Sequence, residues 1–189
     1  MLAPAFIRIS VTGDPGSGKS TFAREVAART GFRLVTTGNI FRQLAADMGV
    51  SVTDLNEIAE TQAQIDRKVD DYLKALNETR ENLVLDSRMA WFFVENSLKI
   101  RLTVDLDVAV ERIFKDTGGE LRETFTDLES GRVEVQRRRD SEILRYKTLY
   151  GVDISDTSNF DLVINTSNKA PQDITEAFEV AFTAYKAGV

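Results

Sequence analysis

The chain has 189 residues, a formal net charge of −6, and neither cysteine nor histidine. This length suits one well-buried core, so we expect a single domain over residues 1–189. The lack of cysteine and histidine excludes disulfides, thiol nucleophiles and imidazole metal sites. The acidic balance argues against DNA or RNA as a partner, because such binding depends on clustered lysine and arginine.

The sequence shows neither a targeting segment nor a membrane span. Residues 1–6 lack a basic region followed by an apolar run. No stretch reaches the ~18 apolar residues that a spanning helix needs. We therefore expect a cytoplasmic protein that acts on small molecules, without a membrane partner and as a monomer.

The first motif lies between a predicted strand at residues 6–11 and a predicted helix at residues 20–27. Its glycines let backbone N–H groups face one anion, and a helix N-terminus attracts the same anion. The motif predicts a nucleotide site in which Lys19 reaches the β- and γ-phosphates and Ser20 ligates Mg²⁺. The residues predicted to hold the nucleotide fill the pattern G-x-x-x-x-G-K-[ST] and add one helical residue: Gly13, Asp14, Pro15, Gly16, Ser17, Gly18, Lys19, Ser20 and Thr21.

Four further runs have the character of buried strands, and helical patterns separate them. Apolar residues recur at helical spacing from Leu106 onward and again after Pro171. Because strands alternate with helices, we predict a three-layer α/β phosphate-loop fold with a five-stranded parallel sheet. The four additional strands are predicted at residues 34–37, 83–86, 100–104 and 160–164.

Two stretches are longer than a minimal five-stranded fold requires. Residues 38–80 hold helical patterns, whereas residues 116–148 are highly charged, start with Gly118-Gly119 and include three consecutive arginines at 137–139. Ligands of an open parallel sheet bind beyond the carboxyl ends of its strands. We therefore expect residues 38–80 to form a helical acceptor-binding insertion and residues 116–148 to form a helical lid.

Polar residues at two further strand ends indicate phosphate transfer. Asp86 at the end of the third strand can hold Mg²⁺ through water. Arginine grips phosphate oxygens in pairs, so Arg42 and Arg88 are predicted to bind an acceptor phosphate. Two alternatives stay open: Arg42 is an ordinary surface residue, and Asp86 forms a local ion pair with Arg88.

Several segments, taken together, resemble the cytidylate kinases of the nucleoside monophosphate kinase group, especially the short archaeal-type form. The most specific segment is R-Y-K-T-L-Y-G-V-D-I-S-D at residues 145–156, which leads to F-D-L-V-I-N-T-S at residues 160–167. The resemblance extends over nearly the whole chain. The other matching segments, in the same order as in the family, are residues 11–21, 37–42 and 85–88.

The resemblance implies transfer of the γ-phosphoryl group of Mg-ATP to the 5′ phosphate of CMP or dCMP, with ATP and Mg²⁺ as the bound groups. Arg138 and Arg145 match the lid arginines of the family, and Arg112 matches an arginine at the adenine or the donor phosphate. The resemblance also implies that Thr37 and Gly38 bind the acceptor, together with Arg42 and Arg88. The catalytic residues implied in this way are Lys19, Arg88, Arg138 and Arg145.

Other interpretations remain open at the level of sequence. The same scaffold supports a UMP or AMP kinase, an alcohol kinase with Asp14 as its base, or a regulatory module that only binds nucleotide. Arg138 also has Glu134 and Glu142 four residues away and can pair with either along an exposed helix. The preferred base and the choice between ribose and deoxyribose are left undetermined.

Overall fold

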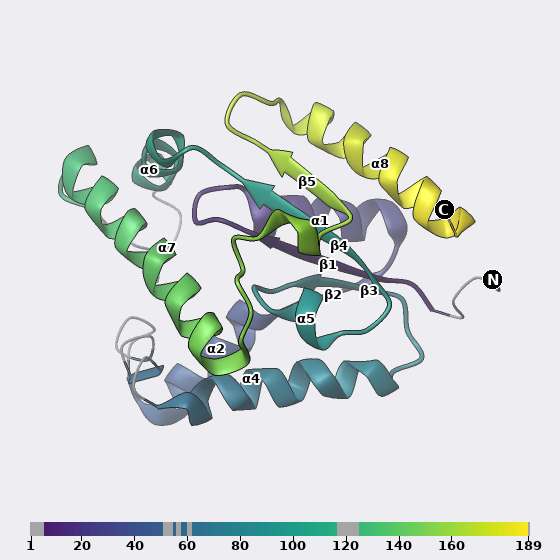
Figure 1. Ribbon diagram of the computed structural model, residues 1–189, viewed down its shortest axis with the longest axis horizontal. Coiled ribbons are helices and arrows are strands. Elements are labelled where there is room, and N and C mark those ends of the chain that lie inside the picture. Colours follow the sequence, from purple (N-terminus) through teal and green to yellow (C-terminus); the bar gives the residue numbers. More distant parts are fainter. Residues whose placement is uncertain (1–5, 51–54, 56–57, 60–61, 117–124, 189) are drawn as a thin grey trace.

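The computed structural model describes residues 6–50, 55, 58–59, 62–116 and 125–188. Five parallel strands form one sheet in the order β2-β3-β1-β4-β5, as Figure 1 shows. The predicted α/β fold with a five-stranded parallel sheet is confirmed. The strands are β1 (Arg8–Gly13), β2 (Arg33–Thr36), β3 (Leu83–Asp86), β4 (Ser97–Thr103) and β5 (Leu162–Asn165).

Some predicted strand bounds were wrong by a few residues. Thr37 begins a helix instead of ending β2, and β4 starts at Ser97, three residues before the predicted start at 100. The short helix α5 (Ala90–Phe93) was not predicted, because four residues are too few for a periodic pattern. The other helical segments are α1 (Lys19–Thr30), α2 (Thr37–Met48), α4 (Ala63–Ala75), η1 (Leu76–Glu78), α6 (Leu106–Lys115), α7 (Leu128–Tyr150), η2 (Thr157–Asn159) and α8 (Pro171–Ala187).

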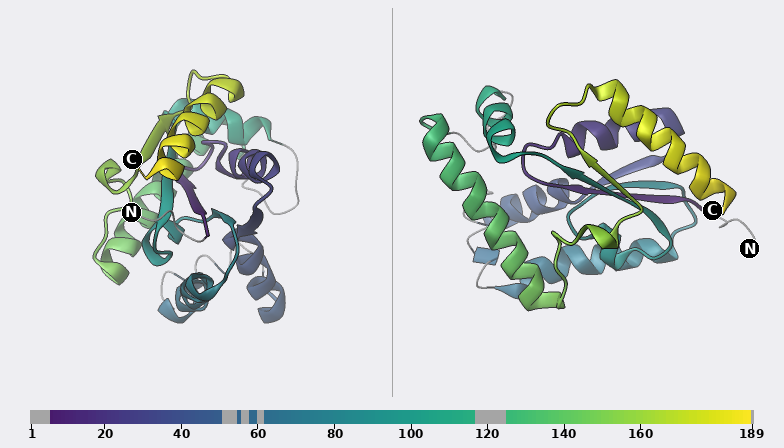
Figure 2. Two further views of the ribbon diagram at one scale, coloured as in Figure 1. Left: turned by 90° about the vertical axis from the view of Figure 1, so that its right-hand side faces the viewer. Right: turned by 45° about the horizontal axis from the view of Figure 1, so that its top comes forward.

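Helices cover both faces of the sheet and make three layers. Figure 2 shows α1 and α8 together on one face. On this face the rings of Phe22 and Phe178 pack edge to face against each other in the core cluster beside the sheet. On the other face, α4, α5 and the C-terminal part of α7 contribute Leu73, Trp91 and Tyr146 to a second core cluster. Burial on both faces explains the nearly continuous apolar runs of the strands.

All five strands end at the edge of the sheet that faces α7, which runs past this edge from α6 to α4 (Figure 1). Val110 of α6 and Val135 of α7 are buried together at one end of this helix. Within the segment predicted as an insertion, α2 and α4 pack together in a small core that contains Ala45 of α2 and Ile65 of α4. The phosphate loop, the end of β3 and α7 therefore lie close together.

Gly118 and Gly119, predicted to start the lid, lie outside the described residues. Within the described part of the chain, no helix is both long and apolar enough to cross a membrane.

Candidate active site

Residues 13–20 connect β1 to α1 through a loop that depends on glycine. Gly16 and Gly18 have φ values of 76° and 82°, which side chains with a Cβ rarely adopt. A Cβ on Gly13 would lie 2.6 Å from the carbonyl oxygen of Leu102. Because α1 begins at Lys19, its first N–H groups lie at the loop, where they attract an anion.

Lys19 and Asp86 meet at the end of this loop. The ammonium group of Lys19 donates a hydrogen bond to the Asp86 carboxylate, which stands at the end of β3. Burial and, next, repulsion from Arg88 lower the pKa of Lys19 to about 7. Ser20, the next residue of α1, is exposed. The loop thus ends in a cation, a carboxylate and an accessible hydroxyl group.

The oxygen atoms at the end of this loop suit a Mg²⁺ ion that also binds a phosphate. They suit a metal ion bound by protein groups alone less well. Asp86 and Ser20 both offer oxygen ligands, which Mg²⁺ prefers. Among the residues that the structure describes, no group of three or more histidine, cysteine, aspartate or glutamate side chains could hold a metal ion. Because Mg²⁺ usually keeps waters and substrate phosphates as ligands, two protein oxygens are sufficient.

Glu142 in α7 is the centre of a second charged group. Its carboxylate forms an ion pair with Arg88 Nε at 2.6 Å and accepts a hydrogen bond of 3.0 Å from Arg138 Nε. Burial raises the pKa of Glu142, but the two arginines outweigh it and hold that pKa below its ordinary value. Of the two glutamates four residues from Arg138, Glu142 therefore pairs with it, whereas Glu134 pairs with Arg137.

A third charged group joins α7 to α4. Asp66 and Asp70 of α4 are only 7% and 4% exposed. The Tyr150 hydroxyl donates to Asp70, while Arg145 Nε lies 3.7 Å from Asp66 Oδ2, too far for a hydrogen bond. These last two atoms are buried, and neither has a hydrogen-bond partner among the described residues. Burial raises the pKa of Asp66, and Arg145 partly offsets this rise.

The first turn of α2 lies beside the end of β3. The Thr37 hydroxyl donates to the carbonyl oxygen of Asp86 at 3.4 Å. Arg42 donates to Asn39, and a Cβ on Gly38 would lie 3.6 Å from the Arg42 guanidinium. The exposed Arg42 therefore folds over the start of this helix.

Arg112 of α6 ties the phosphate loop to the end of β5. Its guanidinium donates to the hydroxyl group of Thr166 at 3.0 Å and to the carbonyl oxygen of the same residue at 2.7 Å. It also donates to the carbonyl oxygen of Gly16 at 3.4 Å. Arg112 thus lies against the middle of the loop, at Gly16.

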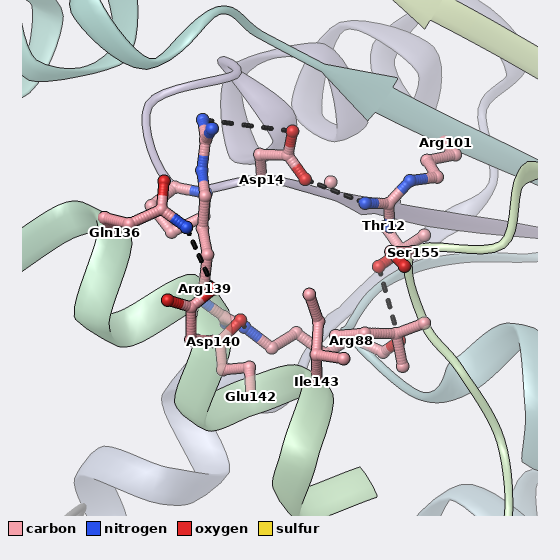
Figure 3. Close-up of a pocket in the computed structure, with 13 residues that line it drawn as sticks. Thr12, Asp14, Arg88, Arg101, Gln136, Arg139, Asp140, Glu142, Ile143 and Ser155 are labelled. Carbon is pink, nitrogen blue, oxygen red and sulfur yellow. Dashed lines mark hydrogen bonds and ion pairs between the residues drawn. The ribbon is translucent and has the colours of Figure 1, made fainter. Parts of the chain in front are cut away.

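The Asp14 carboxylate lies between two arginines, as Figure 3 shows. Arg101 of β4 lies 2.8 Å away and Arg139 of α7 lies 3.9 Å away. A cavity of about 200 Å³ separates this part of the loop from α7. Arg88 and Glu142 also line this cavity, which connects the two charged groups.

Comparison with known proteins identifies the family. The profile of the cytidylate kinase-like family matches residues 8–168. The chain belongs to the cytidylate kinase-like family. The cytidylate kinase of Haloquadratum walsbyi is 36% identical over 180 residues, which cover 94% of this chain and 90% of that protein. For the cytidylate kinase of Pyrococcus horikoshii the identity is 37% over 168 residues, with 88% and 83% covered.

Solved structures share the fold of this cytidylate kinase-like chain at low sequence identity. A shikimate kinase from Bacteroides thetaiotaomicron superposes with a TM-score of 0.64 at 15% identity, covering 94% of this chain and 97% of its own. An uncharacterized protein from Eubacterium ventriosum reaches 0.67 at 13% identity, with 94% and 99% covered. At these identities the likeness concerns the fold alone.

Within this cytidylate kinase-like fold, the predicted site residues form several groups along one edge of the sheet. Lys19 contacts Asp86, and Glu142 links Arg88 to Arg138. Arg145, which like Arg138 matches a lid arginine of the family, lies next to Asp66 of α4. The sequence interpretation assigned no such contact to five residues of these groups: Asp66, Asp70, Arg101, Arg139 and Glu142 as a partner of Arg88.

The sequence contains a signal for only two of these residues, Asp66 and Asp70. Asp66, Asp70 and Leu73 follow i, i+4, i+7 spacing, so both aspartates share a helix face with a buried leucine. That spacing distinguishes them from solvent-facing polar residues. Arg101 and Arg139 had no comparable signal, because their partner Asp14 lies far from both in the sequence.

Proposed function

We propose that this protein is an ATP-dependent kinase for CMP and dCMP, which it converts to CDP and dCDP. The observation that carries this proposal is the cationic group at the end of the phosphate loop. Arg88 and Arg138 come from different elements, share one carboxylate, and lie close enough to Lys19 to lower its pKa. Membership of a family whose relatives are named cytidylate kinases supports the choice of acceptor.

The proposed reaction needs positioning and charge neutralisation rather than a strong base. A phosphate acceptor is already ionised at neutral pH and attacks the γ-phosphorus in line. Lys19 and the loop N–H groups hold the donor phosphates, Arg42 and Arg88 hold the acceptor phosphate, and Arg138 offsets the charge between them. When bound, Mg²⁺ neutralises further donor charge, with Ser20 and Asp86 as its protein ligands.

The proposed parts of the chain correspond to these tasks. Residues 38–80 form the acceptor-binding insertion, and residues 116–148 form the lid, of which α7 makes up most of the described portion. Arg112 and Thr21 contact the donor nucleotide, while Thr37 and Gly38 contact the acceptor. We also propose that the protein acts as a monomer in the cytoplasm.

The pair formed by Asp66 and Arg145 supports an acceptor base that carries an amino group. A buried carboxylate oxygen accepts a hydrogen bond, and a guanidinium donates one, yet these two atoms stand 3.7 Å apart without hydrogen-bond partners among the described residues. Cytosine and adenine present an amino donor beside a ring-nitrogen acceptor. Uracil presents a carbonyl oxygen, which would face the carboxylate, and an N–H group, which would face the guanidinium donor. Neither pair can form a hydrogen bond. Family membership then favours cytosine.

The contacts of Asp14 weaken the alternative of an alcohol kinase. Such an enzyme needs a carboxylate base near the acceptor hydroxyl group. The two oxygens of Asp14 instead accept hydrogen bonds from Arg101 at 2.8 Å and from the Val104 N–H at 3.3 Å. Both carboxylate oxygens are thus already bonded within the protein instead of facing an acceptor hydroxyl group, which supports an acceptor that is already ionised.

A coupled ADP-release assay with Mg-ATP and CMP, dCMP, UMP, AMP, GMP or TMP tests the proposal. We expect the highest kcat/KM for CMP and dCMP. A clear preference for another monophosphate would contradict the proposed base. ATP binding without phosphorylation of any acceptor would instead favour a regulatory module.

A further inference from the structure

We propose that Arg101 is a positioning residue of the phosphate loop: by neutralising Asp14, it keeps the front of the loop in the shape that binds donor phosphates. This inference rests on the proposed binding of ATP. It does not depend on which acceptor is phosphorylated. Arg101 itself lies on β4 and acts only through Asp14.

The ion pair is close and mostly shielded from water. Arg101 Nη2 lies 2.8 Å from Asp14 Oδ1, and the two side chains are only 8% and 16% exposed. Arg139 approaches the other carboxylate oxygen at 3.9 Å and donates to the carbonyl oxygen of Val104 at 2.9 Å. Figure 3 shows the Asp14 carboxylate between these two guanidinium groups. Arg101 is therefore the principal cation for this carboxylate.

Main-chain hydrogen bonds transmit the position of Asp14 to the rest of the loop. Its N–H donates to the carbonyl oxygen of Leu102 at 3.0 Å, and its side chain accepts from the Val104 N–H at 3.3 Å. Its own carbonyl oxygen accepts from the Ser17 N–H at 3.1 Å, across the turn of the loop. A displaced Asp14 would therefore shift the backbone amides that face the donor phosphates.

The charge of Asp14 makes Arg101 necessary. A carboxylate inside a loop that binds a polyanion repels that ligand unless a cation balances it. Conversely, Arg101 lies between Ile100 and Leu102 on a buried strand, where a charged side chain is costly without a partner. Each charge compensates the other. Removing the charge of Arg101 alone leaves the Asp14 carboxylate unpaired next to the bound phosphates. Removing the charges of both Arg101 and Asp14 leaves no unpaired charge there.

The test compares Arg101→Gln, Asp14→Asn and the double variant by calorimetric ATP binding without acceptor, and by steady-state kinetics with CMP. We expect Arg101→Gln to weaken ATP binding about tenfold and to raise the KM for ATP equally, with the KM for CMP within about twofold. The double variant should recover most of the lost ATP affinity. Arg101→Lys keeps the charge and should stay within about threefold of the parent.

The matched control is Arg8→Gln on the neighbouring strand β1. The Arg8 guanidinium is also partly buried, but it donates to the carbonyl oxygens of Asn77 and Thr79 at the opposite end of the sheet. This variant should lower the melting temperature while ATP affinity stays unchanged. If Arg101→Gln behaves in the same way, or if the double variant binds ATP no better than Arg101→Gln, the inference is overturned.

Two features keep this test separate from the test of the proposed function. If the parent protein binds ATP but does not phosphorylate CMP, the acceptor assignment fails and the calorimetric comparison still decides the inference. If Arg101→Gln alone does not fold, Asp14→Asn against the double variant decides it. ATP affinities that differ by less than about twofold between these two variants support the inference, and a larger loss in the double variant contradicts it.

Discussion

Arg88 and Glu142 form an ion pair at 2.6 Å, although one follows β3 and the other lies in the middle of α7. The same carboxylate accepts a hydrogen bond from Arg138. A carboxylate therefore lies between two cations that are proposed to bind phosphate groups. Bound substrate phosphates would compete with Glu142 for these guanidinium groups, so this contact links the stability of α7 to the proposed chemistry.

Glu142→Gln should change how stability depends on pH. The folded pKa of Glu142 lies below its ordinary value of 4.5, so its stabilising effect is present above that pH and is lost as the pH falls through the folded pKa. At pH 7 we expect the variant to be less stable by about 3 kcal/mol, because two arginines lose a buried partner. Urea unfolding from about pH 7 to pH 3 should show the difference shrinking. A difference that is constant with pH would contradict this account.

Lys19→Ala should lower kcat by about 10² to 10³, because the donor phosphates lose the hydrogen bonds and charge of the Lys19 ammonium group. Coupled assays and circular dichroism of the same preparation measure activity and fold. Lys115→Ala is the control, since Lys115 is exposed and pairs with Glu111 on the surface of α6. Normal turnover by a folded Lys19→Ala variant would remove the basis for phosphoryl transfer at this loop.

Arg88→Ala should raise the KM for CMP and also lower kcat, each by about tenfold or more, because its guanidinium is proposed to hold the acceptor phosphate. Initial rates with CMP and ATP varied separately measure both effects. If only ATP affinity changes, Arg88 has been assigned to the wrong substrate.

Arg138→Ala should reduce kcat by about tenfold or more and leave the KM for CMP within about twofold, because this arginine is proposed to act on charge that develops during transfer. Arg137→Ala provides a matched control on the same helix, since Arg137 is exposed and pairs with Glu134. Equal turnover in both variants would favour a purely structural role for the pair of Arg138 and Glu142.

Asp66→Asn should shift the ratio of kcat/KM for CMP over UMP toward UMP by about tenfold or more, because the amide can donate to the uracil carbonyl oxygen. Asp70→Asn makes the same chemical change one helical turn away, where the carboxylate is already bonded to Tyr150. We expect this control to lower the melting temperature and to leave the ratio unchanged. An unchanged ratio in Asp66→Asn would exclude Asp66 from base recognition.

The phosphate loop and the parallel sheet could be predicted because their signals are local. Gly13, Gly16 and Gly18 are required by backbone conformation or by close approach of neighbouring atoms, within eight consecutive residues. Strands buried on both faces and helices with one apolar stripe repeat at short periods that can be read from sequence. The resemblance to the cytidylate kinase-like family rested on similarly continuous segments.

The partners of charged side chains could not be predicted in the same way. Asp14 and Arg101 are 87 residues apart in the chain, and they meet only because β1 and β4 are neighbours in the sheet. Likewise, Asp66 and Arg145 are 79 residues apart in the chain, and they meet only because α7 packs against α4. Local periodicity reports backbone conformation, which neighbouring residues decide. Which charges are neutralised depends on strand order and helix packing, and these bring together residues that no short pattern connects.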